Sequence, residues 1–123
     1  MVEYSLTENT LTSAKGDYRA QINDVRSYDK EALISRILQR GTLLTRTDIL
    51  AVINAMEETI VDIHKEGGTV TLPLFSTGFS ISGVFKGTDD SFDGTRHRLN
   101  ITVQKGKLLK RTQQEIHLQK VDF

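Results

Sequence analysis

The chain has 123 residues and no cysteine or tryptophan, and its 16 basic and 16 acidic residues give a net charge of zero. This length suits one domain, and the lack of cysteine excludes disulfides and thiolate metal sites. The first ten residues include Glu3 and Glu8 and hold no long apolar run, which argues against a signal peptide or a membrane span. We therefore expect a cytoplasmic protein without membrane contact.

Two helices are predicted in the first half of the chain. Segment 29–41 starts with Asp29, a residue type that caps helix N-termini, and it ends at Gly41. Segment 44–68 starts with Thr45 and Asp48, which have the spacing of a capping box. Apolar residues recur in it at intervals of four and three and predict one apolar face: Ile49, Ile53, Met56, Ile60 and Ile63.

The segment after the second helix predicts strands. Residues 67–85 contain no charged residue at all. Alternation predicts strands over 69–75 and 79–85, with a hairpin loop at 76–78 in which Gly78 adopts a positive φ. Pro73 lacks an amide hydrogen and indicates an edge strand or a bulge. A third strand is predicted over 96–104, and the polar link 86–95 is long enough to form a protruding arm.

The remaining segments suggest a short helix and two further strands. Segment 105–114 predicts a short basic helix, and loose alternation predicts a last strand within 115–123. Alternation of Tyr18, Ala20 and Ile22 predicts a strand within 17–28.

Positive charge is concentrated in one stretch of this otherwise balanced chain. Segment 95–114 contains no acidic residue, and its basic residues are Arg96, Arg98, Lys105, Lys107, Lys110 and Arg111. Such a cluster suits contact with nucleic-acid phosphates, although basic runs on helices are often only solvated faces. The start of the short basic helix could also accept a phosphate.

The order of these elements resembles the HU and integration-host-factor family of bacterial DNA-bending proteins. The resemblance covers about residues 29–114 and rests mainly on the motifs KEGGTVTLPLF and KGKLLK. The chain is similar to a divergent HU-like group with an added N-terminal segment and a shortened arm, through LTRTDILAVI, SISGVF, DDSFD and RHRLNI.

The resemblance implies an α+β fold in which a helical hairpin is followed by a three-stranded antiparallel sheet, a short arm and a short C-terminal helix. We expect one HU-like domain over 1–123, with a core at 29–114, an N-terminal extension at 1–28 and a C-terminal strand at 115–123. The resemblance also implies an intertwined homodimer in which the partner covers part of the uncharged segment 67–85. A symmetric dimer is expected on packing grounds as well, because one small helical hairpin does not cover three strands with apolar faces.

The function implied is non-enzymatic, largely sequence-independent binding of double-stranded DNA in the nucleoid, without a cofactor or small-molecule substrate. The residues expected to contact phosphates in a basic saddle are Lys86, Arg96, Arg98, Lys105, Lys107, Lys110 and Arg111. The alternative is an HU-fold dimer that has lost DNA binding and serves as a structural or protein-interaction module.

The arm departs from the family pattern. It holds no proline, and its tip carries Asp89, Asp90 and Asp93, which repel a DNA backbone. Phe92 either forms a wedge between base pairs or packs the arm onto the body of the protein.

The sequence favours neither catalysis nor a metal site. The run DDSFDG matches the start of a calcium loop only in part, since Ser91 and Asn100 occupy ligand positions that call for other residues. The three histidines, His64, His97 and His117, lack ligand spacing and read as surface or packing residues. No catalytic constellation is recognisable, so we expect no enzyme activity.

Overall fold

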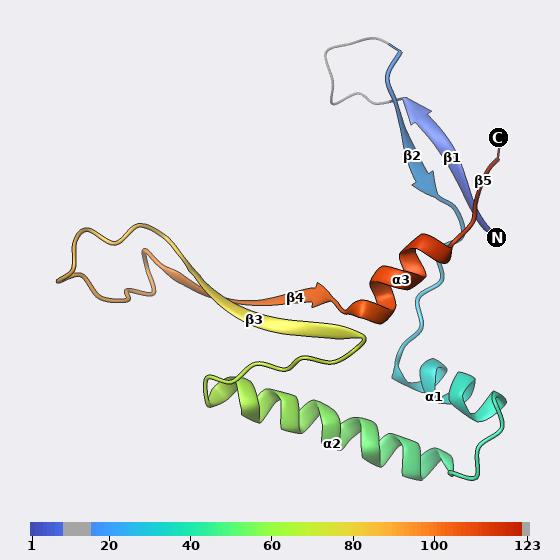
Figure 1. Cartoon of the computed structure of the whole chain (residues 1–123), viewed down its shortest axis with the longest axis horizontal. Coiled ribbons are helices and arrows are strands. Elements are labelled where there is room, and N and C mark those ends of the chain that lie inside the picture. Colours follow the sequence, from blue (N-terminus) through green and yellow to red (C-terminus); the bar gives the residue numbers. More distant parts are fainter. Residues whose placement is uncertain (9–15, 122–123) are drawn as a thin grey trace. The chain divides into compact units, whose positions relative to one another are not determined.

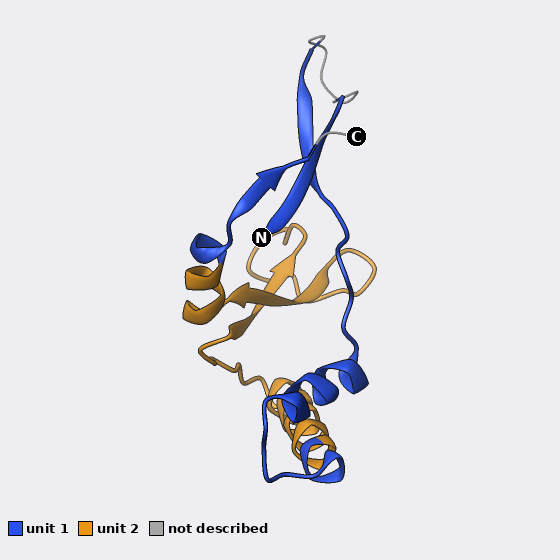
Figure 2. Cartoon of the chain, turned by 90° about the vertical axis from the view of Figure 1, so that its right-hand side faces the viewer, with its two compact units in different colours: residues 1–49, 113–123 blue, residues 50–112 orange. Residues whose placement is uncertain are grey.

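The computed structural model describes residues 1–8 and 16–121, a mixed α+β arrangement of three helices and small sheets (Figure 1). Contacts divide the chain into two compact units, residues 1–49 with 113–123 and residues 50–112 (Figure 2). The α+β class predicted from the sequence is confirmed. The single HU-like domain over 1–123 stays a prediction.

The first unit contains a sheet with β1 (Val2–Glu8) at its centre. Strand β2 (Tyr18–Ile22) pairs with β1 in antiparallel fashion, and β5 (Leu118–Lys120) pairs with its other edge in parallel. The sequence predicted β2 and β5 but not β1, which is the strand that joins them. The end of the predicted last strand, Asp122 and Phe123, lies outside the described residues.

Both helices predicted in the first half of the chain are confirmed together with their N-terminal caps. Helix α1 (Lys30–Gln39) begins where the Ala32 amide donates to the Asp29 carboxylate at 2.8 Å. Helix α2 (Arg46–Lys65) begins with a reciprocal capping box: the Thr45 amide donates to Asp48 Oδ2 at 3.0 Å, and the Asp48 amide donates to Thr45 Oγ1 at 3.1 Å. These bonds satisfy amides that have no partner within the helix.

The first unit also contains the apolar side chains that are buried among the described residues, Ile34 of α1 and Ile49 of α2. Nearby, the Arg46 guanidinium donates to Glu31 Oε2 at 3.0 Å and to Ser35 Oγ at 2.7 Å. The start of α2 is thus joined to α1 by polar contacts.

The second unit is built on a two-stranded antiparallel sheet of β3 (Phe75–Ser82) and β4 (Arg98–Lys105). Phe75 lies opposite Lys105 at one end, and Ser82 lies opposite Arg98 at the other. Residues 83–97 connect the strands, and α3 (Lys107–Glu115) follows β4 directly (Figure 1). The predicted short basic helix is therefore confirmed.

The predicted hairpin loop at 76–78 is wrong, and with it the three-stranded sheet. Residues 76–78 lie inside β3, and Gly78 does not adopt a positive φ. The chain turns three residues earlier, where the Leu72 amide donates to the Phe75 carbonyl at 2.8 Å and Thr71 forms an isolated bridge with Ser76. Pro73 explains this position, because its fixed φ suits the second residue of a turn and it has no amide to donate.

His64 connects the end of α2 to β3. Its Nδ1 donates to the Ile60 carbonyl at 2.6 Å, and its Nε2 lies 2.7 Å from Thr77 Oγ1. Thr77 Oγ1 also accepts the Val70 amide at 2.9 Å, and the His64 ring packs edge-on to Phe79 with centroids 5.6 Å apart. His64 is thus a packing histidine, as the sequence suggested.

Candidate nucleic-acid interface

The cations predicted to bind DNA all lie in the second unit, and all are exposed. Five of them follow one another along β4 and α3, and we call these the basic strip: Arg98, Lys105, Lys107, Lys110 and Arg111. Lys86 and Arg96 lie instead in the connection 83–97. The structure therefore places the predicted residues in two groups with different surroundings.

The start of α3 is held tightly against the Pro73 turn. The Gly106 amide donates to the Leu74 carbonyl at 2.8 Å, and the Leu108 amide donates to the Pro73 carbonyl at 2.9 Å. A Cβ at Gly106 would overlap the Pro73 carbonyl oxygen, so only glycine fits here. A hollow of about 430 Å³ beside this junction is lined by Thr71, Ser76 and the side chains of Lys105, Lys107 and Lys110, among others.

The basic strip has few counter-charges. Arg98, Lys107, Lys110 and Arg111 form no ion pair with any carboxylate in the described part of the chain. Cations left in this state are available to an external anion, and a polyanionic backbone gains affinity by releasing its counterions to them. The strip is the part of the predicted site whose surroundings suit phosphate contact best.

Arg96 is in a different position, because carboxylates of its own loop bind it. Its Nη2 lies 2.9 Å from Asp90 Oδ1 and its Nη1 lies 3.2 Å from Asp90 Oδ2, a bidentate pair. Its Nε lies 3.1 Å from Asp93 Oδ2. We call residues 83–97 the closed loop, since these contacts join its two sides.

The two carboxylates accept further hydrogen bonds that keep them ionised. The Arg96 guanidinium, followed by the Lys86 amide, lowers the pKa of Asp90 to about 2. The Thr95 amide and hydroxyl, followed by Arg96, lower the pKa of Asp93, and the pair of carboxylates raises the pKa of Arg96. A carboxylate with several donors holds its charge because those donors favour the ionised form.

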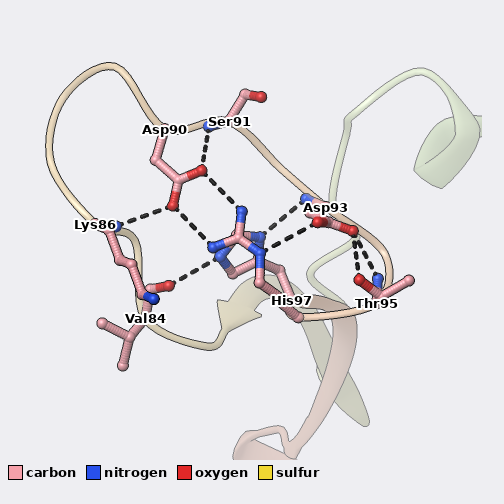
Figure 3. Close-up of polar contacts among 8 residues, drawn as sticks. Val84, Lys86, Asp90, Ser91, Asp93, Thr95 and His97 are labelled. Atoms are coloured by element: carbon pink, nitrogen blue, oxygen red, sulfur yellow. Dashed lines mark hydrogen bonds and ion pairs between the residues drawn. The ribbon is translucent and has the colours of Figure 1, made fainter.

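His97 anchors the base of the closed loop. Its side chain is 4% exposed, and its ring stacks on Phe85 with centroids 3.8 Å apart and planes 3° apart. The Asp93 amide donates to Nδ1 at 2.9 Å, and Nε2 donates to the Val84 carbonyl at 3.0 Å (Figure 3). An amide only donates and a carbonyl only accepts, so these contacts define a neutral ring with its proton on Nε2.

Gly83 allows this close packing at the neck of the loop. Its φ is +111°, and a Cβ there would lie 2.7 Å from the Arg96 carbonyl oxygen. The predicted third strand over 96–104 is correspondingly displaced: β4 starts at Arg98, so Arg96 and His97 precede it. Arg96 therefore does not lie on the outer face of the strand.

The sequence showed that charged residues lie in this loop, but it did not show that Arg96 pairs with Asp90 and Asp93. The ring of Phe92 lies 5.9 Å from that of His97, centroid to centroid, so this contact is made within the closed loop, and Phe92 remains 52% exposed. Both expected roles of Phe92, the wedge and packing onto the body of the protein, stay predictions. No group of three or more metal-ligating side chains gathers within the described residues. The i, i+3 spacing of Asp93 and Arg96 was the one local signal of an ion pair.

One face of the β3–β4 sheet is apolar and exposed. An apolar groove of about 600 Å³ lies between this face and the end of α2, within the second unit, and its walls include Ile60, Val61, Phe75, Phe79, Leu99, Ile101 and Val103. Leu99, Ile101 and Val103 are 57%, 58% and 68% exposed. Exposed apolar patches of this kind mark interaction surfaces.

Comparison with solved structures shows that this fold occurs in a known protein. A crystal structure of a protein from Bacteroides vulgatus ATCC 8482, described as a candidate bacterial DNA-binding protein, matches with a TM-score of 0.80 and 22% identity. The match covers 98% of this chain and 48% of the other, so the chain spans about half the length of that protein. At this identity the likeness shows the fold alone.

No helix in the described residues is long and apolar enough to cross a membrane.

The sequence itself gives two further comparison results. No curated protein matches it significantly. The family model HU-DNA_bdg, a DNA-binding domain, matches residues 1–122, and the chain therefore belongs to this family of DNA-binding domains.

Proposed function

We propose that the protein binds double-stranded DNA without catalysis and largely without regard to sequence, through phosphate contacts of the basic strip. The observation that carries the proposal is that four exposed cations of β4 and α3, Arg98, Lys107, Lys110 and Arg111, have no carboxylate partner among the described residues. Membership of a family of DNA-binding domains supports it. Lys86 adds an exposed cation from the closed loop, whereas Arg96 contributes only when it exchanges its carboxylates for a phosphate.

We further propose that the binding form is a homodimer. Ile34 and Ile49 are the only apolar side chains buried in the described part, which is a small core for a chain of this length. A second copy over the apolar groove would cover Leu99, Ile101 and Val103 and would place two basic strips on one assembly.

This function is of the nucleoid, architectural type, and it would place the protein with the chromosome in the cytoplasm. The second candidate is a dimeric module of the same fold that does not bind DNA. The closed loop favours this candidate, because Asp90 and Asp93 form ion pairs with Arg96, which would otherwise be available to a phosphate.

A salt titration distinguishes the two candidates. Affinity for a fluorescent duplex is measured by anisotropy from low to moderate salt for the wild type, Lys110→Ala and, as a control, Arg40→Ala, which removes an exposed cation outside the basic strip. We expect the logarithm of affinity to fall by about 0.9 per phosphate contact for each log unit of salt. Lys110→Ala should reduce this slope by about one, and Arg40→Ala should leave it unchanged. A wild type that does not bind at low salt would favour the structural module.

A further inference from the structure

The polar face of the β3–β4 sheet is almost free of charge. Side chains alternate along a strand, so residues that lie opposite each other share a face. The register pairs Ser76 with Gln104, Gly78 with Thr102, Ser80 with Asn100 and Ser82 with Arg98. We call these eight residues the polar ladder, in which Arg98 at one end is the sole charged member.

This composition is unusual for a face that meets only water. The chain is 26% charged, yet β3 contains no charged residue, and neither does the whole of residues 67–85. Both strands are edges of a two-stranded sheet, and edges that face solvent are normally protected by charged side chains, lysine above all. A neutral, hydrogen-bonding surface at this place indicates a partner that offers hydrogen bonds rather than charge.

The ladder is also flat at its centre. Gly78 has no side chain, and a Cβ there would lie 3.0 Å from Thr102 Oγ1. Asn100 Nδ2 donates to Ser82 Oγ at 3.3 Å and lies 3.5 Å from Ser80 Oγ. The Asn100 side chain therefore lies along the sheet face, beside both serines. Thr102 and Gln104 are exposed. A glycine in a strand often marks a place where a ligand approaches closely.

Cations bracket this neutral surface. Arg98 stands at one end, and Lys107 and Lys110 follow Gln104 at the other, with six strand steps or about 20 Å between Arg98 and Gln104. A DNA duplex shows the same order of chemistry, because charged phosphates flank a groove whose base edges are neutral donors and acceptors. A two-stranded ribbon is narrow enough to enter the major groove.

We propose that the polar ladder faces a duplex groove and that Thr102 and Gln104 hydrogen-bond to base or sugar edges there. This inference rests on the proposed DNA-binding function and extends it. The cations of the basic strip supply affinity that falls with salt, and the ladder supplies a part that does not, because neutral hydrogen bonds release no counterions. The ladder thus makes the interface selective for a duplex over a single strand, which has no groove.

The test compares two variants by anisotropy over a salt series. The double variant Thr102→Val with Gln104→Met keeps side-chain size and removes hydrogen-bonding groups, and Lys110→Ala removes one cation. We expect the double variant to bind duplex about tenfold more weakly at every salt concentration, with the slope of the wild type. Lys110→Ala should change the slope instead. Binding of single-stranded DNA should be the same for the double variant and the wild type.

The possible outcomes distinguish failure of the groove contact from failure of the proposed DNA binding. A double variant whose line coincides with that of the wild type overturns the groove contact and leaves phosphate binding in place. Equal losses on duplex and single strand also overturn it, because the effect would not depend on a groove. A wild type that binds no DNA at any salt overturns both proposals. Thermal unfolding of the double variant, expected to match the wild type because both side chains are exposed, shows that the fold is intact.

Discussion

The guanidinium of Arg96 binds both carboxylate oxygens of Asp90, at 2.9 and 3.2 Å, while its Nε reaches Asp93. All three nitrogens of the side chain are therefore occupied within residues 83–97. An isolated surface ion pair contributes little to stability, but a bidentate pair in a network contributes more. The same contacts withhold from DNA a cation that the sequence had suggested for it.

Releasing Arg96 should strengthen DNA binding. Asp90→Asn removes the bidentate acceptor, so Arg96 becomes available to a phosphate, and we expect tighter duplex binding at low salt and a salt slope steeper by about one. Asp89→Asn is the matched control, because it removes an equal charge from an exposed residue that does not contact Arg96. Equal gains in both variants would mean that net charge alone acts, and a loss in Asp90→Asn would show that the closed form of the loop promotes binding.

The closed loop should open in acid. Asp90 has its pKa lowered from 3.8 to about 2 in the folded protein, so its stabilising contribution is complete above about pH 4 and is lost as the pH falls toward 2. In NMR spectra the Lys86 amide, which donates to Asp90 Oδ2, should shift over this range. The same amide in Asp90→Asn should show no such titration. A wild-type Lys86 signal that stays constant between pH 4 and 2 would contradict the assignment.

The junction between the Pro73 turn and α3 should depend on Gly106. A methyl group at this position meets the backbone of Pro73 and Leu74, which does not move aside as a flexible side chain would. We expect Gly106→Ala to lower the free energy of unfolding by about 1–3 kcal/mol, measured by urea denaturation. Gly94→Ala is the control, because no atom lies within 4 Å of the added Cβ and φ is not positive there. Equal stability of the two variants would argue against the tight junction.

The apolar groove should be required for dimerisation. Ile101→Glu places a charge in the groove, and we expect monomers by light scattering at micromolar concentration where the wild type is dimeric. Thr102→Glu is adjacent in sequence but lies on the polar ladder, and it should stay dimeric. A wild type that is monomeric under these conditions would refute the dimer, and a dimeric Ile101→Glu would place the interface elsewhere.

Local signals in the sequence were enough to determine the helices. The Asp29 cap, the Thr45–Asp48 capping box and the three-four spacing of apolar residues act within one or two helical turns, so α1 and α2 appear where they were predicted. The basic character of α3 and the charge-free stretch 67–85 could also be read directly. The cations of the candidate site were chosen from such local charge patterns alone.

Only the tertiary structure decided how the strands pair and which cations are free. Strand β1 is defined by partners far away in sequence, and β5 joins it in parallel from the other end of the chain. The turn moved from Gly78 to Pro73 because ladder pairing between β3 and β4 extends through residues 76–78. Arg96 has the same charge as Arg98, but the conformation of residues 83–97 brings two carboxylates to one and none to the other. Sequence determines which charges are present, and the fold determines which of them remain available to a partner.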